Sequence, residues 1–94
     1  MTSSPSIITP SRDLDIASAP QLGRAILNSL DSGNTNLILD FGGVELIDSA
    51  AIGVLLSAQR RVEAAGGQLV VTNPSAHVRR VFALTGVSRA LAVQ

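Results

Sequence analysis

The chain has 94 residues with a formal net charge of zero, of which 46% are hydrophobic and 2% aromatic, and it contains no cysteine. That length and apolar content predict a single small domain with an aliphatic core. The neutral charge excludes a broad electrostatic field for nucleic acid or an anionic membrane. The lack of cysteine excludes disulfides, thiolate nucleophiles and cysteine-ligated metals.

The N-terminus and the hydropathy of the chain predict a cytoplasmic protein. Residues 1–6, MTSSPS, lack the basic and apolar regions of a signal peptide. No apolar run approaches the ~20 residues that a membrane-spanning helix needs. We therefore expect a soluble domain without direct membrane contact, with a flexible N-terminus over residues 1–6 and one folded domain over residues 7–94.

The first third of the chain predicts an extended segment followed by a helix. Residues 7–16 favour one or two short strands broken near Pro10, because apolar and acidic residues alternate in the sequence DLDI. The sequence SAPQ at 18–21 is typical of a helix start, with Ser18 as the cap and Gln21 at the spacing of a capping box. Gly33 predicts the end of this helix. Its expected apolar face repeats every fourth residue, at Leu22, Ile26 and Leu30.

Two more strand–helix units follow. The sequences NLILDF at 36–41 and QLVVTN at 68–73 favour buried strands, although so short an apolar run does not by itself exclude a helix. The helix after Asp48 is expected to end at glycines 66–67, and a further helix to run from Ser75 to Gly86. The tail at 87–94 is expected to pack back as a short strand or a helical turn. The expected inward residues of these two helices are Ile52, Leu55, Ala58, Val62 and Ala65, and then Val78, Val81, Phe82 and either Leu84 or Thr85.

The alternation of strands and helices indicates the fold class. Strands that alternate with helices predict an α/β fold in a single domain. We expect a mixed, mostly parallel sheet of about four strands packed against helices, with each crossover right-handed.

The sequence VELIDSAAIGVLLSAQ at 44–59 places an acid and a hydroxyl where an apolar run ends and a helical pattern begins. Either Asp48 or Ser49 is a good N-cap, because its oxygen accepts from free N–H groups of the first turn. The small residues Ala50, Ala51 and Gly53 keep this surface low, so a partner's backbone can approach closely. A phosphate on Ser49 would meet the positive end of the helix dipole and add about −1.5 to −2 charges.

The sequence does not predict an enzyme. No histidine or lysine stands near Ser49 as a base, and the G-x-S-x-G pattern of a nucleophile elbow is absent. His77 is the one histidine and has no clustered carboxylates with which to share a metal. Neither glycine-rich nucleotide motif occurs. We therefore expect no catalytic residues, no metal and no cofactor.

The stretch at 40–91, DFGGVELIDSAAIGVLLSAQRRVEAAGGQLVVTNPSAHVRRVFALTGVSRAL, resembles the STAS domain of bacterial anti-sigma factor antagonists. The shared features are, in order, a strand ending in Asp-Phe, Ile-Asp-Ser at a helix start, Gly-Gly before a strand, and a Val-x-x-Val-Phe-x-x-x-Gly helix. The segment DLDIASAPQL at 13–22 is similar to the family's N-terminal Gly-Glu-Leu-Asp segment. The resemblance therefore extends over nearly the whole chain and implies the STAS fold.

The resemblance also implies a function in transcription regulation by partner switching. Such an antagonist binds an anti-sigma factor that is a serine kinase of the histidine-kinase-like ATPase fold, and so releases a sigma factor. The kinase phosphorylates the antagonist at the start of the helix after the Asp, which ends the interaction, and a phosphatase resets it. We expect no nucleic acid partner, and a monomer or weak dimer. The expected partner-binding residues are Asp15, Asp48, Ser49, Ala50, Ala51, Ile52 and Gly53.

The family pattern of Asp, two hydroxyl residues, Gly, Leu and Gly is only partly kept. The second hydroxyl residue, which is the family's phosphoacceptor, is replaced by Ala50, and the following Gly by Ala51. Either Ser49 takes the phosphate one position earlier, where its side chain is turned by about 100° on the helix, or the switch is lost. Upstream, Arg12 stands where the family usually has Gly.

A second class of STAS protein is the alternative. The Asp-Ser-Ala order at 48–50 is also similar to small STAS subunits of phospholipid-transport ABC complexes, which need no phosphoacceptor. The glycine pair at 66–67 and the helix that follows the next strand favour the sigma regulators.

Overall fold

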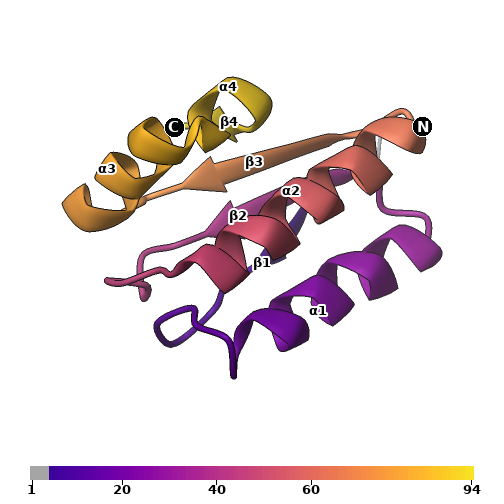
Figure 1. Cartoon of the computed structure of the whole chain (residues 1–94). Helices are drawn as coiled ribbons and strands as arrows, with labels where there is room; N and C mark the ends of the chain where they lie inside the picture. The colour runs from indigo at the N-terminus through magenta and orange to yellow at the C-terminus, as the bar shows by residue number, and fades with distance from the viewer. Residues whose placement is uncertain (1–4) are drawn as a thin grey trace.

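A computed structural model describes residues 5–94, so residues 1–4 of the predicted flexible N-terminus lie outside the described part. The strands and helices alternate as predicted (Figure 1). The tail forms both of its expected alternatives, a helical turn and a short strand. No helix in the described part is long and apolar enough to cross a membrane. In chain order the elements are β1 (Ser6–Ile8), α1 (Ala19–Asp31), β2 (Asn36–Asp40), α2 (Ser49–Ala64), β3 (Gln68–Thr72), α3 (Ala76–Thr85), α4 (Val87–Ala90) and β4 (Ala92–Val93).

The strands form one sheet in the order β1-β2-β3-β4, and every neighbouring pair is parallel. The predicted sheet of about four strands is confirmed, and within residues 5–94 it is parallel throughout rather than mixed. Because consecutive strands are neighbours and parallel, crossovers of the same hand leave their helices on the same face of the sheet. In Figure 1, α1 and α2 accordingly lie side by side in front of the sheet.

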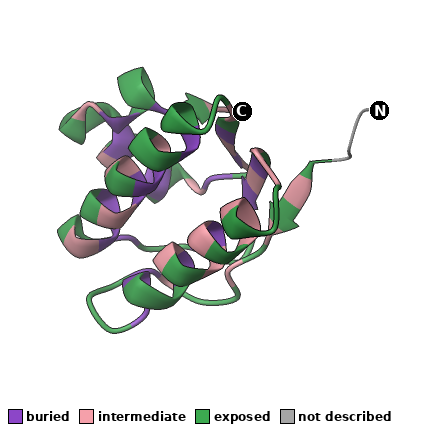
Figure 2. Ribbon diagram, turned by 90° about the vertical axis from the view of Figure 1, so that its right-hand side faces the viewer, coloured by how far each residue is buried: buried purple, intermediate pink, exposed green. Residues whose placement is uncertain are grey.

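The core lies between the sheet and the helices. Leu37 and Leu39 of β2 and Leu69 and Val71 of β3 are buried, whereas the residues between them, including Ile38, are half-buried on the other face. This alternation follows from the twofold periodicity of a strand. In Figure 2 the buried positions lie along the sides of the helices that face the sheet.

The apolar face of α2 follows the predicted helical spacing, with one exception at its end. The buried residues of this helix are Ala51, Ile52, Leu55, Ala58 and Val62. Ala65 was expected inside but is exposed, because α2 ends at the residue before it.

The prediction for the end of α3 is wrong. Val78 and Phe82 are buried, and Val81 is half-buried, as expected. Leu84 and Thr85 are both exposed. Leu84 follows Phe82 by two positions, and a step of two residues turns a side chain by about 200° around a helix, onto the opposite face.

The predicted capping box at the start of α1 is also wrong. Ser18 precedes the helix, but its side chain makes no capping hydrogen bond and is buried. Its hydroxyl donates backward to the carbonyl oxygen of Asp13 at 2.9 Å. The carboxylate of Asp15 instead accepts from the backbone N–H groups of Ala17 and Ser18, both at 2.9 Å. Asp15 therefore caps the turn that precedes α1, and Ser18 does not cap the helix itself.

Gly67 lies where the backbone of β3 approaches the residue before β2. The N–H of Gln68 donates to the Thr35 carbonyl oxygen at 2.9 Å, and a Cβ at Gly67 would overlap that same oxygen. We expect Gly67→Ala to lower the free energy of unfolding by about 1–3 kcal/mol. Urea unfolding followed by far-UV circular dichroism measures this, since the chain has no Trp or Tyr.

The control for this prediction is Gly53→Ala within α2. Gly53 is exposed, and its added Cβ would have nothing within 4 Å. We expect this change to raise stability by about 0.5–1 kcal/mol, because alanine favours the helix over glycine. Equal effects of the two substitutions would contradict the steric explanation.

Candidate functional site

The start of α2 is capped by Asp48. The backbone of this residue is extended (φ −115°, ψ −178°), and its Oδ1 accepts from the N–H of Ala50 at 3.0 Å and of Ala51 at 3.2 Å. Of the two predicted capping residues, Asp48 is therefore the N-cap, and Ser49 is the first helical residue. The carboxylate satisfies two free N–H groups at the positive end of the helix dipole.

The predicted partner-binding residues differ in burial. Ala50 is half-buried, whereas Ala51 and Ile52 are buried in the core. The side chains of Ala51 and Ile52 therefore hold α2 against the sheet and present little surface to a partner. Four of the predicted residues are exposed, namely Asp15, Asp48, Ser49 and Gly53.

Backbone hydrogen bonds bring Asp15 and Asp48 to the same part of the molecule. The N–H of Leu14 donates to the carbonyl oxygen of Leu46, and the N–H of Asp48 donates to the carbonyl oxygen of Leu14, both at 3.1 Å. These bonds form an isolated parallel bridge between Leu14 and Ile47. The segment before α1 and the segment before α2 are thereby paired, although about thirty residues separate them in the chain.

Asp13 adds a side-chain bond to this pairing. Its Oδ1 accepts from the backbone N–H groups of Glu45 at 2.9 Å and Leu46 at 3.0 Å. Two N–H groups of the segment before α2 are thus satisfied by one carboxylate. The sequence interpretation did not identify Asp13 as a site residue, and its one signal was the alternation of acidic and apolar residues in DLDI.

Asp15 is held by the turn that precedes α1. Its Oδ1 accepts from the backbone N–H of Ser18 and, at 3.1 Å, from the hydroxyl of the same residue. These two bonds from Ser18, the backbone bond first, hold the pKa of Asp15 below its ordinary value of 3.8. Asp15 therefore carries a full negative charge near neutral pH. The hydrogen bonds of the turn hold this charge in one position.

A second group of polar residues holds the segment before α2 from the other side. The hydroxyl of Ser75, which caps α3 by accepting from the N–H of Val78, donates to the carbonyl oxygen of Glu45 at 2.9 Å.

The end of β2 is held by a further carboxylate. The Oδ1 of Asp40 accepts from the N–H of Gly42 at 2.9 Å and from the side-chain amide of Asn73 at 3.1 Å. The bond from Gly42 and then that from Asn73 lower the pKa of Asp40. Nothing in the local sequence connects Asp40 to Asn73, which lies 33 positions later in the chain.

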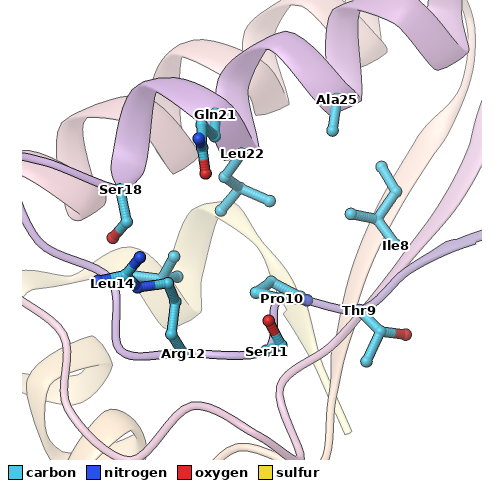
Figure 3. A pocket seen from close by; sticks show the side chains of 10 residues that line it. All are labelled: Ile8, Thr9, Pro10, Ser11, Arg12, Leu14, Ser18, Gln21, Leu22 and Ala25. Carbon is cyan, nitrogen blue, oxygen red and sulfur yellow. The ribbon is translucent and has the colours of Figure 1, made fainter.

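The described residues show a small cavity but no metal site. Residues 5–94 contain no group of side chains that could hold a metal ion, and the strand order lacks the reversal at which open α/β sheets form a ligand crevice. A cavity of about 220 Å³ lies between the segment after β1 and α1, with Ser18 and Arg12 at one end and Ile8 and Ala25 at the other (Figure 3). This volume is below the roughly 300–1,000 Å³ of usual ligand pockets. The start of α2 instead has the chemistry of a contact surface, with exposed carboxylates, one hydroxyl and small side chains.

The capping role of Asp48 gives a direct prediction for stability. We expect Asp48→Ala to lower the free energy of unfolding by about 1 kcal/mol, because two N–H groups of the first turn lose their acceptor. The matched control is Asp48→Asn, whose side-chain oxygen caps nearly as well and should leave stability almost unchanged. Urea unfolding at neutral pH compares the two variants, and an equal loss in both would contradict capping as the cause.

Comparison with known proteins gives one family. The chain matches the family model of the STAS domain over residues 2–94. It is 30% identical over 76 residues to the anti-sigma F factor antagonist of Lysinibacillus sphaericus, a match that covers 80% of this chain and 65% of the relative. The crystal structure of the Thermotoga maritima protein TM1081 is similar with a TM-score of 0.86 at 27% identity, over 93% of this chain and 75% of that one. The unphosphorylated anti-sigma factor antagonist SpoIIAA is similar with a TM-score of 0.75 at 25% identity, over 100% of this chain and 83% of that one. The chain therefore belongs to the STAS domain family.

Proposed function

We propose that this protein is an anti-sigma factor antagonist that binds a kinase-type anti-sigma factor through the start of α2 and so releases a sigma factor for transcription. The names of its relatives support the general role. The observation that carries the proposal is the start of α2, where Asp48, Ser49 and Gly53 are exposed, and where the segment that leads into the helix is held by Asp13 on one side and Ser75 on the other. A held backbone loses little conformational entropy on binding.

Binding to an anti-sigma factor does not require this chain to catalyse a reaction. Its relatives are named as anti-sigma factor antagonists, which are regulators. The family resemblance implies that the kinase and phosphatase steps belong to other proteins. No histidine or lysine stands beside the exposed Ser49 in the first turn of α2, where its sequence neighbours are Asp48 and Ala50. We therefore propose a non-catalytic, cytoplasmic binding protein.

We propose further that the phosphorylation switch of the family is lost at this site. Ala50 has no hydroxyl at the position of the usual phosphoacceptor. Ser49 is one residue earlier and beside the Asp48 carboxylate, which already accepts from the N–H groups of Ala50 and Ala51. A phosphate on Ser49 would therefore meet a like charge, and the donors that favour anions at a helix start are already engaged. Binding by this chain would then be controlled by its abundance.

The binding proposal is tested with a purified kinase-type anti-sigma factor from the same organism, alone and in complex with its sigma factor. Addition of this protein should release free sigma factor on size-exclusion chromatography, and calorimetry should give a dissociation constant. We expect Gly53→Arg to weaken binding by about tenfold or more, because a long side chain then covers the exposed first turns of α2.

Ala64→Arg at the other end of α2 is the matched control. Ala64 is exposed, and it is the last residue of the same helix. This variant should bind as the unchanged protein does. Failure to bind any kinase-type anti-sigma factor, together with co-purification of ABC-transporter permease and ATPase subunits, would replace the proposal with the transport alternative.

Loss of the switch is tested by restoring the hydroxyl. We expect the kinase, with ATP, to leave the unchanged protein unmodified and to add one phosphoryl group to Ala50→Ser, as measured by intact mass. The double variant Ser49→Ala, Ala50→Ser separates the two positions and should be modified equally. Phosphorylation of the unchanged protein that is abolished by Ser49→Ala would contradict the loss of the switch.

A further inference from the structure

Four large apolar side chains of the described residues are exposed to solvent. Their exposed fractions are 64% for Ile7, 78% for Ile16, 54% for Leu46 and 80% for Leu84. Single exposed apolar residues are common on protein surfaces and need no explanation. Ile16 and Leu46 differ from the other two because both lie on the paired segments beside the start of α2.

The pairing of these segments determines where Ile16 and Leu46 point. Leu14 and Ile47 form the parallel bridge, and both of their side chains are buried. Because successive side chains of an extended segment point to opposite sides, Leu46 points outward on the same side as Asp48. Ile16 lies in the turn that the carboxylate of Asp15 closes. The two aliphatic side chains therefore border the exposed carboxylates of Asp15 and Asp48.

The backbone that carries these side chains is held in place. The N–H of Leu46 donates to Asp13 at 3.0 Å, and its carbonyl oxygen accepts from Leu14 at 3.1 Å. The turn around Ile16 is closed by the bonds from Ala17 and Ser18 to Asp15. An apolar side chain on a rigid backbone contributes to binding at a low cost in conformational entropy.

The charges around these two side chains indicate the chemistry of the partner. Asp13, Asp15, Glu45 and Asp48 lie on or beside the paired segments, where Arg12 is the one basic residue. The chain as a whole is neutral, so this end is acidic relative to the rest. A complementary surface would carry apolar pockets next to arginine or lysine side chains.

We propose that Ile16 and Leu46 are the main anchors of the interface with the anti-sigma factor, inserting into apolar pockets that basic side chains flank. This inference rests on the proposed function. It extends that function by naming the residues that contribute most to binding. These residues lie on the two segments before α1 and α2 and not in the helix start itself. The start of α2 lies beside these anchors, and its small residues let the backbone of the partner approach closely.

Calorimetry with the purified anti-sigma factor tests the anchors. We expect Ile16→Ala and Leu46→Ala each to raise the dissociation constant by about tenfold or more. The matched controls are Ile7→Ala and Leu84→Ala, which remove equally exposed aliphatic side chains away from the paired segments and should change the constant by less than about twofold. Leu46→Met keeps an apolar side chain of similar volume and should retain most of the affinity. Far-UV circular dichroism checks that every variant remains folded.

The outcomes separate this inference from the proposed function. If the unchanged protein binds and the anchor variants behave like the controls, the anchors are wrong while the antagonist function stands. If the unchanged protein does not bind at all, both fail. If sedimentation shows self-association that Ile16→Ala and Leu46→Ala abolish while binding of the anti-sigma factor persists, this surface joins two copies of the chain and the inference is overturned.

Discussion

The bonds between the segment before α1 and the segment before α2 determine where α2 begins, and the candidate site depends on them. Asp13 accepts from two backbone N–H groups across this pairing, and Leu14 makes one bond in each direction. Ser75 holds the same segment from the side of α3. With the backbone held at several points, Asp48 is placed to cap the helix and Ser49 to face solvent.

The topology explains why the candidate site lies at this end of the sheet. All strands are parallel and follow chain order, so the loops that leave β1 and β2 emerge at the same edge and their helices pack on one face. Without a reversal of strand order, no crevice opens between neighbouring loops. The paired loops carry four acidic residues and the two exposed aliphatic side chains Ile16 and Leu46.

Periodicity predicted most of the elements correctly, because apolar side chains must be buried at the spacing of a helix or a strand. It failed near the ends of two elements. Ser18 had the sequence of a cap, but the turn before α1 directs its hydroxyl toward Asp13. Either Leu84 or Thr85 was expected inside at the end of α3, but both are exposed. The family resemblance pointed to Asp15 and Asp48, and the structure shows that hydrogen bonds place both carboxylates.

The sequence by itself determined the α/β class, the order of elements, the STAS resemblance and the absence of a hydroxyl at position 50, since each follows from residue types and local spacing. Only the tertiary structure decided that Asp13 supports the site, that Ala51 belongs to the core, and that Ile16 and Leu46 lie beside the start of α2. The reason is physical. These properties depend on hydrogen bonds and burial between residues about thirty positions apart, and local periodicity carries no information about such distant contacts.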